Sequence, residues 1–352
     1  MRVRQGGARP GGTGPRRGMA AVVRGWGGVA SMALACLLAA ALVLVLPRVT
    51  GGDDRGAGSG GGGADRVQAQ AAPARAAEDC EEPERSLRPD DKDGPTIEAI
   101  KNREVKKLIV GVDQNSFGWG YRDPNKPKGA LQGFDIDLAR EIGRQILGKE
   151  DAVVFRAIPT NKRIPALENG DVDMVIRTMT VDCDRVEKVD FSTAYFATGQ
   201  QILAPKSSRI TGFNSTLQGK KVCSAEGSTA FKELKENSFG ADISTTVPNQ
   251  LDCLVRLQLG EVEAVVTDGA LAASQAAQDP TVELKGGPLK PEPEYYAVAM
   301  KKGSTDLVRR VNAVLDDYRT RKEKGWKASY DEWLRKPLRG KSATPPEPKY
   351  RD

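Results

Sequence analysis

The segment Val172–Phe196 (VDMVIRTMTVDCDRVEKVDFSTAYF) combines residue types suited to binding a small carboxylate. Its first five residues, 172–176, are apolar apart from Asp173 and are predicted to form a buried strand, which leads into a turn with two hydroxyls, Thr178 and Thr180. Arg185 follows, and a guanidinium group binds a carboxylate through two parallel charge-assisted bonds. The alternative is a surface turn whose Arg is solvated, and the spacing alone leaves both open.

The positive charge of the chain is concentrated at its N-terminus. The 352 residues have a formal net charge of +6, but residues 1–50 contain seven Arg and no Asp or Glu. The rest of the chain is therefore slightly acidic, which argues against a nucleic-acid-binding surface. Residues 1–28 are predicted to be a basic cytoplasmic segment, and the 18 residues 29–46 have the apolar composition of a signal anchor or a signal peptide.

We expect the apolar segment 29–46 to be an uncleaved anchor, because a membrane-spanning helix needs about 18 or more apolar residues. A cleaved signal peptide and a lipid anchor at Cys36 are the alternatives. In each case the residues beyond 50 lie outside the cytoplasm. The prediction is a protein held at the extracytoplasmic face of the cell membrane.

Short apolar runs alternate with helical patterns in two successive groups between residues 96 and 336. The first group has predicted strands at 108–112, 153–157 and 172–176 and helices near 134–146 and 163–168. The second has strands at 221–224, 243–247, 264–267 and 296–300 and helices at 229–236, 250–259, 269–277 and 307–318. This alternation predicts an α/β fold of two lobes, each a mainly parallel sheet flanked by helices. Ligands of such sheets bind beyond the carboxyl ends of the strands, where Thr178 and Asp268 lie.

The domain boundaries follow from the same patterns. Residues 96–203 and 304–336 are predicted to form the first lobe, and residues 204–303 the second, with hinge crossovers near 204–207 and 300–303. Residues 47–95 are predicted to be a Gly/Ala-rich tether followed by an acidic arm, and residues 337–352 a Pro-rich tail.

Four further cysteines, an even number, suit two disulfides in an oxidising compartment: Cys80, Cys183, Cys223 and Cys253. Their spacing matches no zinc site and the chain has no His, so no metal is predicted. We favour Cys223–Cys253, which falls within one expected lobe, and Cys80–Cys183, which would join the acidic arm to the other. Four buried thiols are the alternative.

Several segments, in this order and spacing, resemble the polar amino-acid-binding proteins of extracellular solute-binding protein family 3. The resemblance covers about Thr96–Leu334 and rests on LIVGVD (108–113), GFDIDLAREI (133–142), TMTVDCDR (178–185), GKKVCSAEGS (219–228) and LGEVEAVVTD (259–268). It implies a two-lobed periplasmic-binding-protein-like fold of type II with two hinge crossovers. The cysteines, the arm CEEPERSLRP and the tail PPEPKY are similar to a narrower, GlnH-type branch of glutamate and aspartate sensors.

The resemblance also implies roles for individual residues. Arg185, with Thr180 and the backbone near Thr178, would bind the α-carboxylate of an amino acid. Asp268 would accept the α-ammonium, with a helix cap as the alternative role for this Asp. Ser228 would offer its N–H and hydroxyl to the carboxylate.

Specificity is expected to come from the cationic side of the site. Arg163, near Thr160, would reach a side-chain carboxylate, and Arg177 would add a second cation; a neutral ligand would then be disfavoured by roughly 2–5 kcal/mol. The alternatives are a solvated Arg163 and a salt bridge from Arg177 to Asp173 or Asp184.

Residues after the first predicted strand complete the expected site. Asp113 ends that strand. Phe117, Trp119 and Tyr121 follow it, and they would either cover the ligand or pack the lobes together.

The leading hypothesis is therefore a monomeric extracytoplasmic receptor that closes on L-glutamate or L-aspartate. It would signal to a GlnX-like membrane sensor partner that acts on a cytoplasmic Ser/Thr kinase. The alternative is the substrate-binding subunit of an amino-acid ABC transporter, with an ABC permease as partner. No cofactor is implied, and an enzyme is not predicted, because the chain has no His and no carboxylate pair in a plausible acid/base environment.

Overall fold

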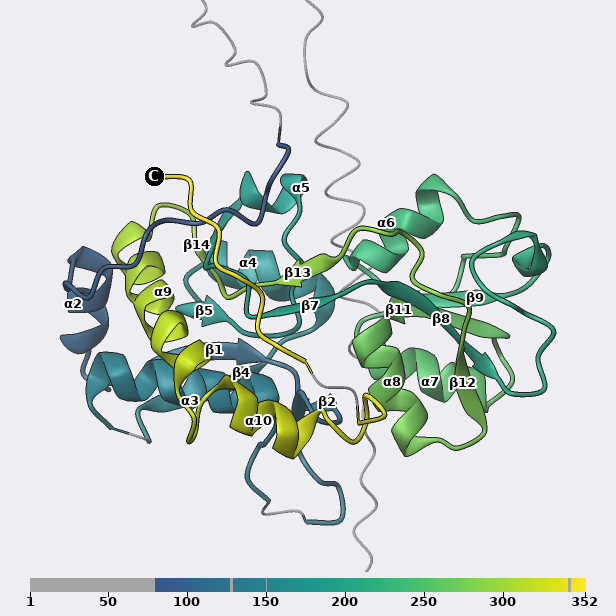
Figure 1. Cartoon of the computed structure of the whole chain (residues 1–352), viewed down its shortest axis with the longest axis horizontal. Coiled ribbons are helices and arrows are strands. Elements are labelled where there is room, and N and C mark those ends of the chain that lie inside the picture. The colour runs from purple at the N-terminus through teal and green to yellow at the C-terminus, as the bar shows by residue number, and fades with distance from the viewer. Residues whose placement is uncertain (1–79, 127–128, 150, 341–342) are drawn as a thin grey trace, which may run out of the picture. The chain divides into compact units, whose positions relative to one another are not determined.

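Two five-stranded sheets form the framework of the protein, each flanked by helices (Figure 1). The computed structural model describes residues 80–126, 129–149, 151–340 and 343–352, all within one compact unit, Pro73–Asp352. The strand order is β4-β1-β5-β14-β6 in the first sheet and β10-β9-β11-β8-β12 in the second. The expected two-lobed α/β fold is confirmed.

The first lobe is built from both ends of the described chain. Its strands are β1 (Leu108–Val112), β4 (Val153–Ala157), β5 (Met174–Val175), β6 (Val189–Phe191) and β14 (Ala299–Lys301), with a small hairpin of β2 (Asn115–Ser116) and β3 (Gly120–Tyr121). Its helices are α2 (Pro95–Lys101), α3 (Phe134–Leu147), α4 (Arg163–Glu168), α5 (Cys183–Val186), α9 (Thr305–Thr320) and α10 (Trp326–Trp333). The apolar face of α3 packs into a core shared with α9 and α10, because its apolar residues recur every three to four positions.

The second lobe repeats this plan with fewer helices. Its strands are β8 (Gln200–Pro205), β9 (Val222–Ala225), β10 (Thr246–Val247), β11 (Ala264–Asp268) and β12 (Val282–Lys285). Its helices are α6 (Thr229–Glu236), α7 (Gln250–Gln258) and α8 (Gly269–Gln278). Two apolar clusters fill the lobe, one containing Cys223 and Leu254 and the other Val222 and Leu234.

The chain passes between the lobes through a separate two-stranded ribbon. β7 (Phe196–Thr198) and β13 (Glu294–Tyr296) pair antiparallel in this ribbon. Each is followed by the single strand that runs against the other four of its sheet, β8 in the second lobe and β14 in the first. The lobe boundaries expected after residues 203 and 303 therefore lie a few residues downstream of β7 and β13, where the chain passes between the lobes. In the sequence these short strands cannot be told from the strands that follow them.

The acidic arm and the Pro-rich tail run side by side over the first lobe (Figure 1). Ser86 forms a parallel bridge with Tyr350, and its backbone N–H donates to the carbonyl of Lys349 at 3.0 Å. The structure pairs Cys80 with Cys183, at the start of α5, so the arm is also linked covalently to this lobe. The second disulfide, Cys223–Cys253, joins β9 to α7, and both pairs are those that the sequence favours.

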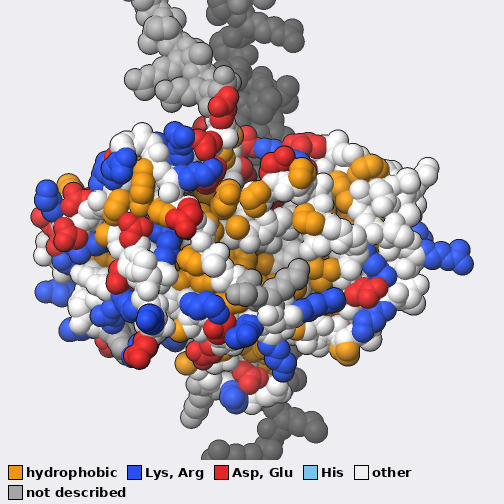
Figure 2. Space-filling view, viewed as in Figure 1, with side chains coloured by type: hydrophobic (Ala, Val, Ile, Leu, Met, Phe, Trp, Pro, Cys, Tyr) orange, Lys and Arg blue, Asp and Glu red, His pale blue; other side chains and the backbone are white. Residues whose placement is uncertain are grey.

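The predicted membrane localisation needs correction. No helix among the described residues 80–352 is long and apolar enough to cross a bilayer. The segment 29–46, from which an anchor was expected, lies outside the described residues, as does Cys36. On the face drawn in Figure 2, Lys and Arg side chains are interspersed with Asp and Glu, so that face presents no field of a single sign.

Candidate ligand-binding site between the lobes

A narrow pocket with a volume of about 20 Å³ lies between the two lobes and is lined by side chains from both. The first lobe contributes Asp113, Thr160, Arg163, Arg177, Thr178, Thr180 and Arg185. The second contributes Ser228, Thr229, Gln250, Thr267, Asp268 and Leu271. Every residue predicted for the ligand site therefore reaches one pocket, except Phe117.

The ends of parallel strands explain why these residues meet. In the first lobe Asp113 follows β1, Thr160 follows β4 and Thr178 follows β5, and these three strands are parallel neighbours. In the second lobe Asp268 ends β11 and Ser228 follows β9. Because the carboxyl ends of parallel strands share one sheet edge, each lobe presents its polar residues to the crevice.

Thr178 is held in an unusual backbone conformation by a buried acid. Its φ of +41° lies in the left-handed region, which is uncommon for a residue with a branched side chain. Its N–H donates to Oδ2 of Asp135 at 3.1 Å, and the hydroxyl of Tyr195 donates to Oδ1 at 2.9 Å. Burial raises the pKa of Asp135 to about 7. The sequence did not single out Asp135, because acidic residues are common in the first turn of a helix, where they interact favourably with the helix dipole.

Arg177 is neutralised within the protein. Its guanidinium forms a buried ion pair with Asp113 at 2.8 Å and donates to Oγ1 of Thr160 at 2.9 Å. Asp173 and Asp184, the partners that the sequence suggested, pair with other cations. The expectation of a second free cation at Arg177 is therefore corrected: Asp113 supplies its counter-charge, so this Arg is part of the pocket wall.

Arg163 is a buried cation of a different kind. It is 4% exposed, which rules out the solvated alternative, and it donates to the backbone carbonyls of Thr160 at 2.9 Å and Gly227 at 3.4 Å. No carboxylate of the described residues lies at ion-pair distance from it. Burial, then the positive charges of Arg185 and Arg177, lower the pKa of Arg163 well below its usual value. The site therefore holds a positive charge that lacks a paired anion.

Arg185, in the short helix α5, lies beside Arg163. Its guanidinium is 3.3 Å from a carboxylate oxygen of Asp182, and it donates to the carbonyls of Thr180 at 2.5 Å and Gly227 at 3.1 Å. Asp182 also caps the helix by accepting from the N–H of Arg185 at 2.9 Å. The carbonyl of Gly227, from the second lobe, therefore bridges two first-lobe guanidinium groups.

Asp268 is directed into the pocket and does not cap α8, although it precedes that helix. Its Oδ1 accepts from Nε2 of Gln200 at 2.5 Å, and its Oδ2 accepts from the hydroxyl of Tyr296. Burial raises the pKa of Asp268, and the hydrogen bonds from Tyr296 and Gln200 oppose this shift. The helix-cap alternative is therefore not what the geometry supports.

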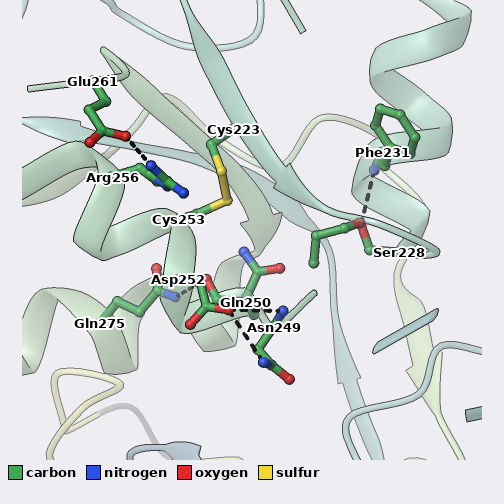
Figure 3. The surroundings of a disulfide bond; sticks show 11 residues. Cys223, Ser228, Phe231, Asn249, Gln250, Asp252, Cys253, Arg256, Glu261 and Gln275 are labelled. Carbon is green, nitrogen blue, oxygen red and sulfur yellow. Dashed lines mark hydrogen bonds and ion pairs between the residues drawn. A yellow bond between two sulfur atoms is a disulfide. The ribbon is translucent and has the colours of Figure 1, made fainter. Parts of the chain in front are cut away.

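Ser228 lines the pocket, but its donors are used within its own turn. Its Oγ donates to the carbonyl of Ala225 at 2.6 Å and accepts from the N–H of Phe231 at 3.1 Å, which caps α6 (Figure 3). Its N–H also donates to Ala225. The Cys223–Cys253 bond lies on the same side of the sheet as Gln250 and braces this wall (Figure 3). The donor role expected of Ser228 stays a prediction.

Phe117 and its aromatic neighbours belong to the packing between the lobes. Phe117 contacts the ring of Tyr121 edge-on at 5.4 Å and lines a small separate cavity with Leu271. Trp119 is fully buried and its Nε1 donates to Oγ of Ser274, in α8, at 3.2 Å. Of the two roles that the sequence left open, the structure favours packing.

Two polar residues of the hinge region reach the site without having been predicted. Glu294 in β13 accepts hydrogen bonds from Thr180, Gln200 and Thr229, and Gln200 in β8 also contacts Asp268. The segment PEPEYY around Glu294 reads as a loop because of its two Pro residues, and this concealed the short strand β13.

Hydrogen bonds join the two lobes directly beside the pocket. The N–H of Thr160 donates to the carbonyl of Pro248 at 3.0 Å, and Nδ2 of Asn161 donates to a carboxylate oxygen of Glu226 at 2.6 Å. Gly227 has φ +74°, and a Cβ there would lie 2.9 Å from Cα of Asn161. A small molecule bound between the lobes would therefore contact both of them.

Comparison with known proteins agrees with this architecture. Residues 108–336 match the family model of bacterial extracellular solute-binding proteins, family 3. The ABC transporter glutamine-binding protein GlnH of Bacillus subtilis is 32% identical over 240 residues, 68% of this chain and 85% of that protein. The glutamate-binding protein GluB of Corynebacterium efficiens is 27% identical over 62% of this chain and 76% of its own length. The crystal structure of a solute receptor for L-cysteine of Neisseria gonorrhoeae superposes with a TM-score of 0.66 at 27% identity, covering 72% of this chain and all of that one.

Proposed function

Because this chain belongs to the bacterial extracellular solute-binding proteins of family 3, we propose that it binds a free acidic amino acid, L-glutamate or L-aspartate, between its lobes. The observation that carries the proposal is the buried guanidinium of Arg163. It has no ion-pair partner among the described residues, and burying an unpaired charge is costly unless a ligand compensates it.

The other charged groups suit the rest of such a ligand. Arg185, beside Arg163, would bind the α-carboxylate, and Asp268 on the opposite lobe would accept the α-ammonium. Arg163 would then bind the side-chain carboxylate. Arg177 is not assigned a ligand charge, because Asp113 already pairs with it. A neutral amide in place of the side-chain carboxylate would leave Arg163 uncompensated.

Calorimetry on protein stripped of ligand tests the specificity. We expect L-glutamate and L-aspartate to bind, and L-glutamine and L-asparagine to bind at least about tenfold more weakly, a difference of about 1.4 kcal/mol. L-Arginine serves as a cationic control and should not bind, because it would add a fourth guanidinium to the three that line the pocket. Equal affinity for glutamate and glutamine would contradict the role given to Arg163.

We further propose that the protein acts as a monomer whose ligand-bound form is read by a membrane protein of the GlnX type, as in a sensor. The alternative is delivery of the ligand to an ABC permease, which the name of the B. subtilis relative supports. Uptake of labelled glutamate by cells with and without this chain separates the two: uptake that is lost with the chain indicates transport, and unchanged uptake indicates sensing.

A further inference from the structure

Glu294 lies in the hinge ribbon, and one of its carboxylate oxygens contacts groups from both lobes. Oε2 accepts from Oγ1 of Thr180, in the first lobe, at 3.1 Å and from Oγ1 of Thr229, in the second lobe, at 3.2 Å. The same oxygen accepts from Nε2 of Gln200, where β8 begins, at 2.9 Å. The complete set of three bonds therefore depends on how the two lobes are placed relative to one another.

Glu294 and Asp268 are held around a single donor group. Nε2 of Gln200 lies 2.5 Å from Oδ1 of Asp268 and 2.9 Å from Oε2 of Glu294. Neither acid forms an ion pair with any Lys or Arg of the described residues. Two negative charges this close repel each other, which favours a proton on one of them. Arg163 and Arg185 are near enough for their charges to oppose the rise that burial causes in the pKa of Asp268, but neither lies at ion-pair distance from it, so the ammonium of an amino acid can supply a paired cation.

The charged surroundings of Glu294 are few. Asp268 faces it from β11, with the hydroxyl of Tyr296 bonded to that Asp. Lys290, which precedes β13, is paired with Glu233 of α6. Burial, then the negative charge of Asp268, raise the pKa of Glu294 to about 7. The chain contains no His, so no histidine titrates in the same range.

We propose that Glu294 is a positioning residue of the closed state: it joins the two lobes as a carboxylate, and it becomes fully ionised when the ligand's ammonium binds beside Asp268. All three donors contact Oε2, and a carboxylate oxygen accepts hydrogen bonds more strongly than the carbonyl oxygen of a protonated acid. The ammonium offsets the charge of Asp268, which favours loss of the proton from Glu294 to solvent. Ligand binding is thereby coupled to the release of the proton that Glu294 carries in the ligand-free protein.

This inference rests on the proposed function, because it needs a ligand with an ammonium group. The test is calorimetry of the full chain with L-glutamate at pH 6, 7 and 8, in buffers that differ in ionisation enthalpy. In the wild type the affinity should rise about tenfold from pH 6 to pH 8, with release of nearly one proton at pH 6, about half a proton at pH 7 and little at pH 8. The charge of glutamate itself is constant over this range.

Variants of the hinge ribbon separate positioning from general stability. Glu294→Gln should bind with an affinity that changes less than about twofold from pH 6 to 8, and it should release no proton. Glu292→Gln, at an exposed neighbour, should behave as wild type. Thr229→Val keeps the acid but removes the second-lobe donor, and it should bind several-fold more weakly while retaining the pH dependence.

The outcomes also separate this inference from the proposed function. A wild type that binds no acidic amino acid at any pH overturns both. A wild type that binds, together with a Glu294→Gln variant of unchanged pH dependence and proton release, overturns only the role of Glu294. The role of Glu294 is also overturned if Asp135→Asn, and not Glu294→Gln, removes the pH dependence. It is likewise overturned if Thr229→Val binds glutamate as tightly as wild type.

Discussion

Replacing Arg163 by Met tests the central feature of the pocket, because it removes the charge and keeps a long unbranched side chain. In the ligand-bound protein the side-chain carboxylate of glutamate would then be buried without its partner. Breaking a buried ion pair in this way costs about 3–5 kcal/mol, which raises the Kd for L-glutamate roughly 200- to 5000-fold. For L-glutamine the loss is that of a hydrogen bond from a charged group, about 1.5–3 kcal/mol, so the preference for glutamate should largely disappear.

The same variant should leave the ligand-free protein nearly as stable as before. Arg163 donates to three backbone carbonyls, each such bond contributing about 1 kcal/mol. Against this, its removal relieves the burial of an unpaired charge and the repulsion from Arg177 and Arg185. We therefore expect the unfolding temperature without ligand to change by less than about 5 °C.

The assay is calorimetric titration with L-glutamate and L-glutamine, together with thermal unfolding in the presence and absence of each. Arg156→Met, at an exposed position of β4, is the matched control and should bind as wild type. If Arg163→Met binds glutamate within about threefold of the wild-type affinity, the assignment of this guanidinium to the ligand is refuted. A collapse of ligand-free stability would instead mark Arg163 as a structural residue.

Two further predictions concern closure and pH. Gly227→Ala should weaken glutamate binding about 10- to 100-fold, because its Cβ would meet the backbone of Asn161 in the other lobe. Gly219→Ala is the control in the same titration and should bind glutamate as wild type, because Gly219 has a similar positive φ but open space around it. Asp135 holds its proton up to about pH 7 when folded but only to about 3.8 when unfolded, so its contribution to stability is lost as the pH rises through 7. The unfolding temperature should therefore fall between pH 5 and 8, and less steeply in Asp135→Asn; equal slopes would contradict this.

The sequence was most informative where strand ends determine position. Thr178, Thr180 and Asp268 follow apolar runs, and the carboxyl edge of a parallel sheet brings such residues together whatever the rest of the fold does. The pairing of the four cysteines followed from the same division into lobes. These features depend on local pattern and on the order of elements along the chain.

Partners that depend on three-dimensional register were not predictable. Asp113 and Arg177 are far apart in sequence, and only the adjacency of β1 and β5 brings their side chains together. Glu294 was missed because a three-residue strand such as β13 carries no detectable period. Phe117 was predicted to contact the ligand because aromatic residues are equally suited to covering a ligand and to packing two lobes together.

The placement of the two disulfides has a mechanical consequence. One joins the arm to α5 within the first lobe, and the other joins β9 to α7 within the second lobe. Neither disulfide crosses the hinge ribbon. Among the described residues, the main chain is therefore the only covalent connection between the lobes. We therefore expect any opening of the lobes to take place at β7 and β13, and reduction of either disulfide to leave that motion unhindered.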